Sequence, residues 1–296
     1  MSTKRLVMSD IRNAHLKKIT YLPMSWFLAL VSRFIVLVLA ANFLQGCEIE
    51  YPWKLQESEV KNMVVDGIIT NEMKAQRINL SITNTKPNKL SEPLSGATVT
   101  VDDKNNQYHF IESSTIPGSY FSLPFQAVVG KTYVLTIFNN SKTFTARDSM
   151  VSITELSSFN LSIESKGDFY VYNHIKTGMP AIIEVYFDWT KSTEYTQTYG
   201  SREAQETFYI LKNVDINEVL HPDKEIIRFP KGTKIIRRKY SLSEEHQVFI
   251  RSLLMETEWR GGLFDVQQGN VSTNLNNGAL GFFGVCMILK DSMVVN

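Results

Sequence analysis

Cysteine is almost absent from this chain. Cys47 and Cys286 are the only two among 296 residues, so no cysteine cluster of the kind that binds zinc can form. If Cys47 is modified, a disulfide is excluded as well. We therefore expect stability to come from burial of apolar side chains. Cys286 stands in the apolar run GFFGVCMIL, which predicts a buried packing thiol.

Other signatures of chemistry are also missing. The five histidines are far apart and form no HExxH or His-x-His motif, so we expect no metal site and no cofactor. There is no G-x-S-x-G elbow and no glycine-rich phosphate loop that opens a helix. Adjacent carboxylates such as Glu244-Glu245 do not share a helix face. The sequence thus favours a protein that is not an enzyme, although carboxylates distant in sequence can converge in space.

The chain has little net charge. Six basic residues against one acid (Asp10) give residues 1–46 a charge of +5, so the total of +1 leaves about −4 for residues 47–296. A mildly acidic body argues against nucleic acid as a partner. Arg237-Arg238-Lys239 is a short basic patch within it. We expect a solvated strand face there, with an anion or lipid-headgroup contact as the alternative.

One uninterrupted apolar run lies near the N-terminus. Residues 34–41 (FIVLVLAA) follow Arg33 and precede Leu44-Gln45-Gly46-Cys47. A positive flank, a short apolar core and a small residue before the cleavage point are typical of a secretory signal, and the cysteine makes it a lipoprotein signal. We predict cleavage after Gly46 and attachment of a diacylglycerol to Cys47.

Lipidation of Cys47 would make residues 1–46 a signal peptide and would fix the protein to a membrane, because each buried methylene contributes about 0.8 kcal/mol. One alternative is an uncleaved anchor helix over residues 26–44, which would place Arg33 within the bilayer. Another is a buried core helix. The charged leader is long, so Met8 and Met24 are alternative starts to Met1.

Residues 47–62 are polar and we interpret them as a lipidated tether. Short segments of alternating apolar and polar residues follow, separated by turn residues, from residue 63 to 146. Examples are 77–83, 98–101 and 133–137. Seven short strands with no helical stretch predict a small antiparallel β-sandwich over residues 63–150.

Residues 151–296 are also mostly β, with clear alternation from Ala181 to Phe187. One helix, over about 242–258, is predicted from the capping-box spacing of Ser241 and Glu244 and from the lack of glycine or proline until Gly261. Its expected packing face consists of Phe249, Ile250, Leu253, Leu254 and Thr257. No linker marks the boundary near residue 150, so we expect the two domains to pack together.

Aromatic residues stand out in the polar segment 188–206. Trp189, Tyr195 and Tyr199 lie in or beside it, where core packing is least expected. Exposed aromatics on loops commonly contact a sugar, a peptide or a protein, so these three are candidate ligand or partner residues. The alternative is that they anchor the loop on the sandwich.

Several motifs follow the lipoprotein signal in order: VVDGIITNE (64–72), LSGATVTVDD (94–103), PGSYFS (117–122), VVGKTYVLTI (128–137) and GNVSTNLNNGALGFFG (269–284). By these the chain resembles a family of Bacteroidetes lipoproteins, domain-of-unknown-function family 4249, over residues 45–290. Motifs such as G-A-T-V-T and G-K-T-Y are typical of immunoglobulin-like or transthyretin-like strands. The expected fold is therefore mainly β: such an antiparallel sandwich packed with a C-terminal β-rich domain containing one helix.

The resemblance implies an outer-membrane lipoprotein found with TonB-dependent transporters, and it supplies no catalytic residues. Glu48 and Glu50 loosely resemble the acidic signal that sends such lipoproteins to the cell surface. The expected function is a non-catalytic binding or accessory subunit of a TonB-dependent nutrient-uptake system. The alternatives are a surface adhesin-like module that binds glycan or protein, and a polysaccharide or peptide hydrolase.

Overall fold

The computed structural model describes residues 28, 31–36, 61–84, 89–164, 169–175, 178–193, 195, 200–213, 226–259, 269 and 271–296. Two compact units are distinguished, residues 1–56 and 57–296. In the first, residues 31–36 are helical. Of the helices within the described ranges, none is both long enough and apolar enough to cross a bilayer. The predicted cleavage site, Cys47, Glu48 and Glu50 lie outside the described residues, as does the tether up to residue 60.

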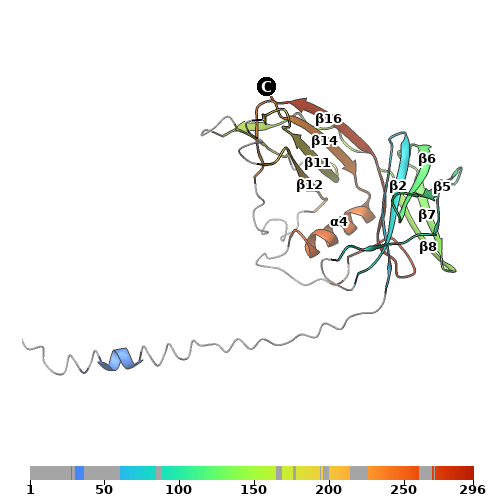
Figure 1. Cartoon of the computed structure of the whole chain (residues 1–296), viewed down its shortest axis with the longest axis horizontal. Coiled ribbons are helices and arrows are strands. Elements are labelled where there is room, and N and C mark those ends of the chain that lie inside the picture. The colour runs from blue at the N-terminus through green and yellow to red at the C-terminus, as the bar shows by residue number, and fades with distance from the viewer. Residues whose placement is uncertain are drawn as a thin grey trace, which may run out of the picture. The chain divides into compact units, whose positions relative to one another are not determined.

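Strands dominate the second unit (Figure 1). In chain order they are β1 (Met63–Thr70), β2 (Lys74–Ile82), β3 (Glu92–Pro93), β4 (Thr98–Asp102), β5 (Gln107–Glu112), β6 (Ser119–Phe125), β7 (Thr132–Asn139), β8 (Lys142–Ser149), β9 (Leu161–Ile163), β10 (Phe169–Tyr172), β11 (Ala181–Asp188), β12 (Glu203–Ile210), β13 (Arg228–Pro230), β14 (Lys234–Ser241), β15 (Leu280–Cys286) and β16 (Ile288–Val294). The helix α4 (Glu244–Glu256) stands between β14 and β15. The predicted mainly β fold is confirmed.

A nine-stranded sheet forms the first body, in the order β15-β1-β2-β6-β5-β4-β7-β8, with β3 attached to β2. Because side chains alternate along each strand, one face gathers the apolar residues into a core. That core includes Val65, Ile78, Leu80, Val99, Tyr120, Tyr133, Leu135 and Phe283. The two ends of the sheet meet, since the backbone N–H of Val285 on β15 donates to the Asp148 carboxylate of β8 at 2.7 Å. The sheet is therefore barrel-like.

Strand β15 comes from the predicted C-terminal domain and runs parallel to β1. Residues 63–150 therefore do not complete the first body alone, and the sheet is not purely antiparallel. The edge of β1 would otherwise present unpaired backbone groups, and β15 satisfies them. A division at residue 150 thus separates segments that share one sheet and one core.

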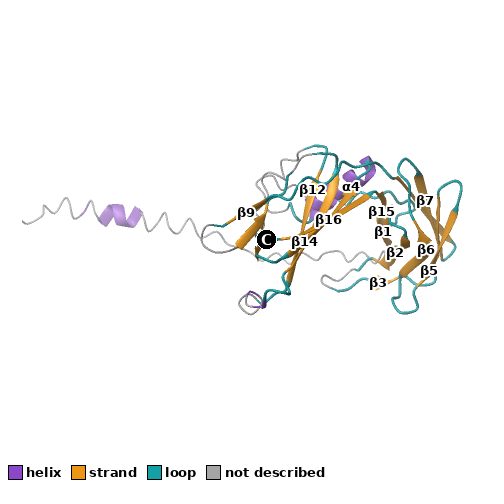
Figure 2. Ribbon diagram, turned by 90° about the horizontal axis from the view of Figure 1, so that it is seen from above, coloured by secondary structure: helices purple, strands orange, loops and turns teal. Residues whose placement is uncertain are grey.

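The second body contains a four-stranded sheet, β12-β11-β14-β16, and a three-stranded sheet, β13-β10-β9. Their shared core includes Ile183, Val185, Phe187, Phe229 and Ile235. Only Met287 separates β15 from β16, so the chain passes directly from the first body to the second; Figure 2 shows β15 beside β1 and β16 beside β14. Met287 packs against both cores. The two bodies therefore lie next to each other, because a single residue connects β15 of the first to β16 of the second.

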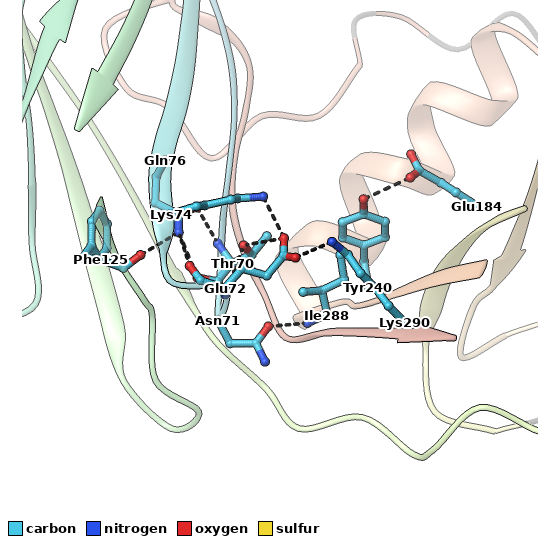
Figure 3. Close-up of polar contacts among 10 residues, drawn as sticks. All are labelled: Thr70, Asn71, Glu72, Lys74, Gln76, Phe125, Glu184, Tyr240, Ile288 and Lys290. Carbon is cyan, nitrogen blue, oxygen red and sulfur yellow. Dashed lines mark hydrogen bonds and ion pairs between the residues drawn. The ribbon is translucent and has the colours of Figure 1, made fainter. Parts of the chain in front are cut away.

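The turn between β1 and β2 ties the first body to β16. The backbone N–H of Ile288 donates to Asn71 Oδ1 at 2.7 Å, and Lys290 pairs with Glu72 (Figure 3). Buried Gln76 holds this turn, because its side-chain N–H groups donate to three backbone carbonyls. The Asn-Glu end of the motif VVDGIITNE thus has a structural role.

Helix α4 begins at Glu244, two residues later than predicted. Its N-cap is Ser243, whose hydroxyl accepts the His246 N–H at 3.1 Å. The predicted cap, Ser241, instead lies in β14 and accepts the Met287 N–H at 2.8 Å. The helix ends at Glu256, with Thr257 as its C-cap, before Gly261. The Ser241–Glu244 spacing was therefore the wrong capping box.

One side of α4 packs on the four-stranded sheet through Ile250 and Leu254, which meet Ile182. Phe249 stacks on Phe282 of β15 with ring centroids 4.9 Å apart, so the helix contacts both bodies (Figure 1). Burial of Ile250 and Leu254 confirms that part of the predicted face. Leu253 is half-buried and Thr257 is exposed, whereas His246 and Met255, which were not predicted on this face, are buried.

Candidate functional site

Two of the three aromatic candidates, Trp189 and Tyr195, pack against the fold. Trp189 is only 3% exposed, and its indole N–H donates to the Ser201 carbonyl at 2.8 Å. Tyr195 is half-buried, packs edge-on against Trp189 and donates its hydroxyl to the Arg228 carbonyl at 2.6 Å. Tyr199 lies outside the described residues. The prediction that Trp189 contacts a ligand is wrong, because it continues the buried alternation that runs through Phe187 on β11.

Cys286, His246 and Asp148 converge in the interior. The Cys286 sulfur lies 3.6 Å from His246 Nδ1, and Asp148 is buried nearby. A thiol, an imidazole and a carboxylate are the components of a nucleophilic catalytic site. Whether these three could act as one depends on the protonation states of the thiol and the imidazole. Burial raises the pKa of the Cys286 thiol far above its usual range and lowers the pKa of His246 to about 4. Both groups are therefore neutral, and a thiol without a thiolate is a poor nucleophile.

Complete burial of Cys286 confirms the predicted packing thiol. In a Cys47→Ala chain, where Cys286 is the remaining cysteine, we expect maleimide labelling of the native protein to be on the order of 100-fold slower than in guanidinium, because the thiol reacts only through opening of the fold. A Ser292→Cys variant, with an exposed thiol, should label at once and serves as the control. Rapid labelling of Cys286 in the native chain would contradict this account.

An open hollow of about 530 Å³ lies between β7, β8, α4 and residues 272–276. We call it the α4 groove. Two exposed apolar residues, Val134 and Val248, face it together with the buried ring of Phe282. Arg147 and Glu245 supply one charge of each sign. An apolar centre flanked by charged groups is the usual composition of a ligand or partner contact.

Asparagine side chains build one wall of the α4 groove. Asn276 accepts the Thr145 N–H at 2.7 Å through its side-chain oxygen and returns its backbone N–H to the Thr145 carbonyl at 3.1 Å. Asn274 donates to the carbonyls of Arg147 at 3.0 Å and of Phe283 at 2.8 Å. The segment thus pairs with β8 as a strand would, which explains the motif NLNNG and fixes the wall in place.

A second hollow of about 250 Å³ lies on the other side of Val248, lined by Lys212, Gln247 and Arg251 among others. Val248 is 56% exposed, so an apolar side chain stands on the outer face of α4 between two depressions. Sequence reasoning missed this surface because it combines three segments distant in the chain. The available signal was Val248 itself, an apolar residue between Glu244, Glu245 and Arg251 on the polar face of the helix.

The remaining motifs support the scaffold. In PGSYFS, the Tyr120 hydroxyl donates to the Leu94 carbonyl at 2.9 Å and accepts the Ala97 N–H at 3.1 Å, so it holds the segment LSGAT. In GKTY, Lys131 pairs with Asp103 at 2.9 Å. Burial alone would raise the pKa of Asp103, but Lys131 and the backbone N–H groups of its own turn outweigh burial and lower that pKa to about 2.

Among the described residues, no group of three or more histidine, cysteine, aspartate or glutamate side chains is placed to hold a metal ion. The candidate site that the structure shows is therefore the α4 groove, an open surface suited to contact with a ligand or a partner.

No curated protein matches the sequence. The family model described as "Domain of unknown function (DUF4249)" matches residues 48–291, which confirms the resemblance seen in the motifs. The chain belongs to this family, DUF4249.

Proposed function

We propose that this protein is a non-catalytic binding or accessory subunit of a TonB-dependent nutrient-uptake system, anchored at the outer membrane by lipid on Cys47. The observation that carries the binding role is the α4 groove, an open hollow with exposed Val134 and Val248 beside Arg147 and Glu245. The residues that line the groove are suited to apolar and charged contacts with a partner, and they do not pair a nucleophile with a base. The thiol and imidazole at Cys286 and His246 are sealed in the core.

Anchoring to the membrane would strengthen binding through the α4 groove. A domain confined to a membrane meets a membrane protein at a high local concentration, so a contact of modest affinity can persist. The lipoprotein signal and the acidic residues Glu48 and Glu50 support the location, through their resemblance to surface lipoproteins. Among the alternatives, the adhesin-like module has lost its main support, because Trp189 is part of the core.

Intact-mass analysis of the membrane-extracted chain tests the anchor. We expect a product that begins at residue 47 and carries acyl chains, because cleavage follows lipidation at the cysteine. Cys47→Ala should leave residues 1–46 attached and abolish acylation entirely. Cys286→Ala removes the other cysteine and should be processed like the wild type. A native product with an unmodified Cys47 would refute the anchor.

Co-purification in mild detergent tests the partner. We expect a TonB-dependent transporter to accompany the wild type and to be lost with Val248→Glu, which places a charge in the middle of the α4 groove surface. Leu123→Glu changes an equally apolar and highly exposed residue on β6 and should retain the transporter. Recovery of the chain alone, or retention of the transporter by Val248→Glu, would contradict the proposal.

A further inference from the structure

Two cations of the basic patch are buried. The prediction of a solvated face at Arg237-Arg238-Lys239 is wrong, since Arg237 is 2% exposed and Lys239 is 4% exposed. Alternation along β14 places both on the same side as buried Ile235, facing the core of the second body. Buried charges are costly unless they are paired, so their partners decide what this cluster does.

Arg237 is fully engaged. Its Nε and Nη2 groups donate to both carboxylate oxygens of Asp291, and Nη2 also donates to the Ser157 carbonyl at 2.7 Å. Its Nη1 donates to the Tyr172 hydroxyl at 3.3 Å, and the guanidinium lies 3.7 Å from the centre of the Phe159 ring. The charge of Arg237 is therefore balanced by Asp291.

Lys239 has neutral partners instead. Its ammonium donates to the Thr154 carbonyl at 3.0 Å, the Thr154 hydroxyl at 3.1 Å and the Glu155 carbonyl at 3.3 Å. Burial and the neighbouring charge of Arg237 lower the pKa of Lys239. Asp291 pairs with Arg237 alone, so the ammonium of Lys239 is buried without a paired carboxylate.

A cavity of about 60 Å³ adjoins these two cations, and Thr154, Tyr172 and His174 also line it. The hydroxyls of Tyr172 and Thr154 accept hydrogen bonds from Arg237 and Lys239, so each keeps its own proton to donate. No acceptor for either proton is found within the described parts of the chain. Exposed Glu155 borders the cavity as well and gives its backbone carbonyl to Lys239.

We propose that this cavity binds a small oxyanion, a carboxylate or an inorganic phosphate. An anion there neutralises the charge of Lys239 and accepts the hydroxyl protons of Tyr172 and Thr154. One water needs about 10–15 Å³ of such volume, so a cavity of about 60 Å³ corresponds to about four to six waters, the size of an anion with four or five non-hydrogen atoms. Binding would also fasten residues 154–157, which both cations hold, to the sheet. This site is separate from the α4 groove and does not depend on the proposed function.

Calorimetric titration and thermal unfolding of the chain with sodium phosphate or sodium acetate, at constant ionic strength in chloride, test the site. We expect saturable binding with one site and a rise of about 5 °C in the unfolding midpoint near saturation. Lys239→Met should abolish both effects. Lys234→Met is the matched control, because Lys234 is exposed on the same strand, and it should leave both unchanged.

Tyr172→Phe covers the case in which Lys239→Met fails to fold. It removes one hydroxyl from the cavity wall and should weaken binding about tenfold, as loss of a hydrogen bond to a charged group does. The proposal is overturned if neither anion binds saturably to the wild type. It is overturned equally if binding persists unchanged in Tyr172→Phe, since the anion then sits elsewhere.

Discussion

Gly281→Ala should prevent the first body from forming. Gly281 has a φ of +87°, and a Cβ there would lie 2.0 Å from the carbonyl oxygen of Val65 and 2.9 Å from its carbonyl carbon. Both are backbone atoms of β1, the strand that pairs in register with β15 at this point. No rotamer change relieves such a contact, so the two strands must separate. We expect a loss of at least about 4 kcal/mol in the free energy of unfolding, measured in guanidinium, or an insoluble chain.

Gly278→Ala is the matched control. Gly278 precedes β15 in the same segment, has a similar φ of +77° and has no atom within 4 Å of the Cβ position. The substitution therefore adds only the strain of a left-handed backbone, about 1–2 kcal/mol. The difference between the two variants isolates the contact with Val65. Equal losses would mean that backbone strain, rather than the β1–β15 approach, makes glycine necessary at residue 281.

Local patterns gave a good account of individual strands. Alternation in residues 77–83 and 181–187 predicted β2 and β11, because burial of one sheet face imposes a two-residue period on the sequence itself. The buried thiol of Cys286 followed from its apolar neighbours in the same way. These features are decided by residues adjacent in the chain.

Pairing between distant segments was not predictable. Nothing near Gly281 indicates that β15 joins β1, some 215 residues earlier, in parallel. The α4 groove likewise depends on β7, β8 and residues 272–276 meeting beside Val248. Local sequence patterns do not reveal which distant segments become neighbours, because their proximity results from the closure of the whole sheet.

Two predictions were wrong because the polarity of the residues was given more weight than the two-residue alternation of the strand. The alternation that buries Phe187 extends to Trp189, yet the polar residues after it suggested a loop. Ile235, Arg237 and Lys239 also alternate, yet their charges suggested solvent. In both places the alternation correctly indicates which side chains are buried. Long cationic side chains can follow it when acceptors such as Asp291 and backbone carbonyls are supplied from another segment.

Asp148→Ala should cost about 3 kcal/mol, because the variant leaves several donors unsatisfied in the core. The buried carboxylate accepts the N–H groups of Val285 at 2.7 Å and Ser149 at 2.8 Å, and it also accepts from the Ser243 hydroxyl. It thus joins β8, β15 and the N-cap of α4. Asp66→Asn, at an exposed carboxylate on β1, should change stability by less than about 0.5 kcal/mol.

The pH dependence of Asp148→Asn separates hydrogen bonding from charge. Burial raises the pKa of Asp148 above its ordinary value, so the folded state holds the proton more tightly than the unfolded state does. The free energy of unfolding of the wild type must then fall as the pH rises from the ordinary pKa through the raised one. The variant lacks this loss, so the stability advantage of the wild type over Asp148→Asn should shrink between pH 3.5 and pH 7 in urea unfolding. An advantage that grows with pH would mean that the three donors stabilise the carboxylate more than burial disfavours it.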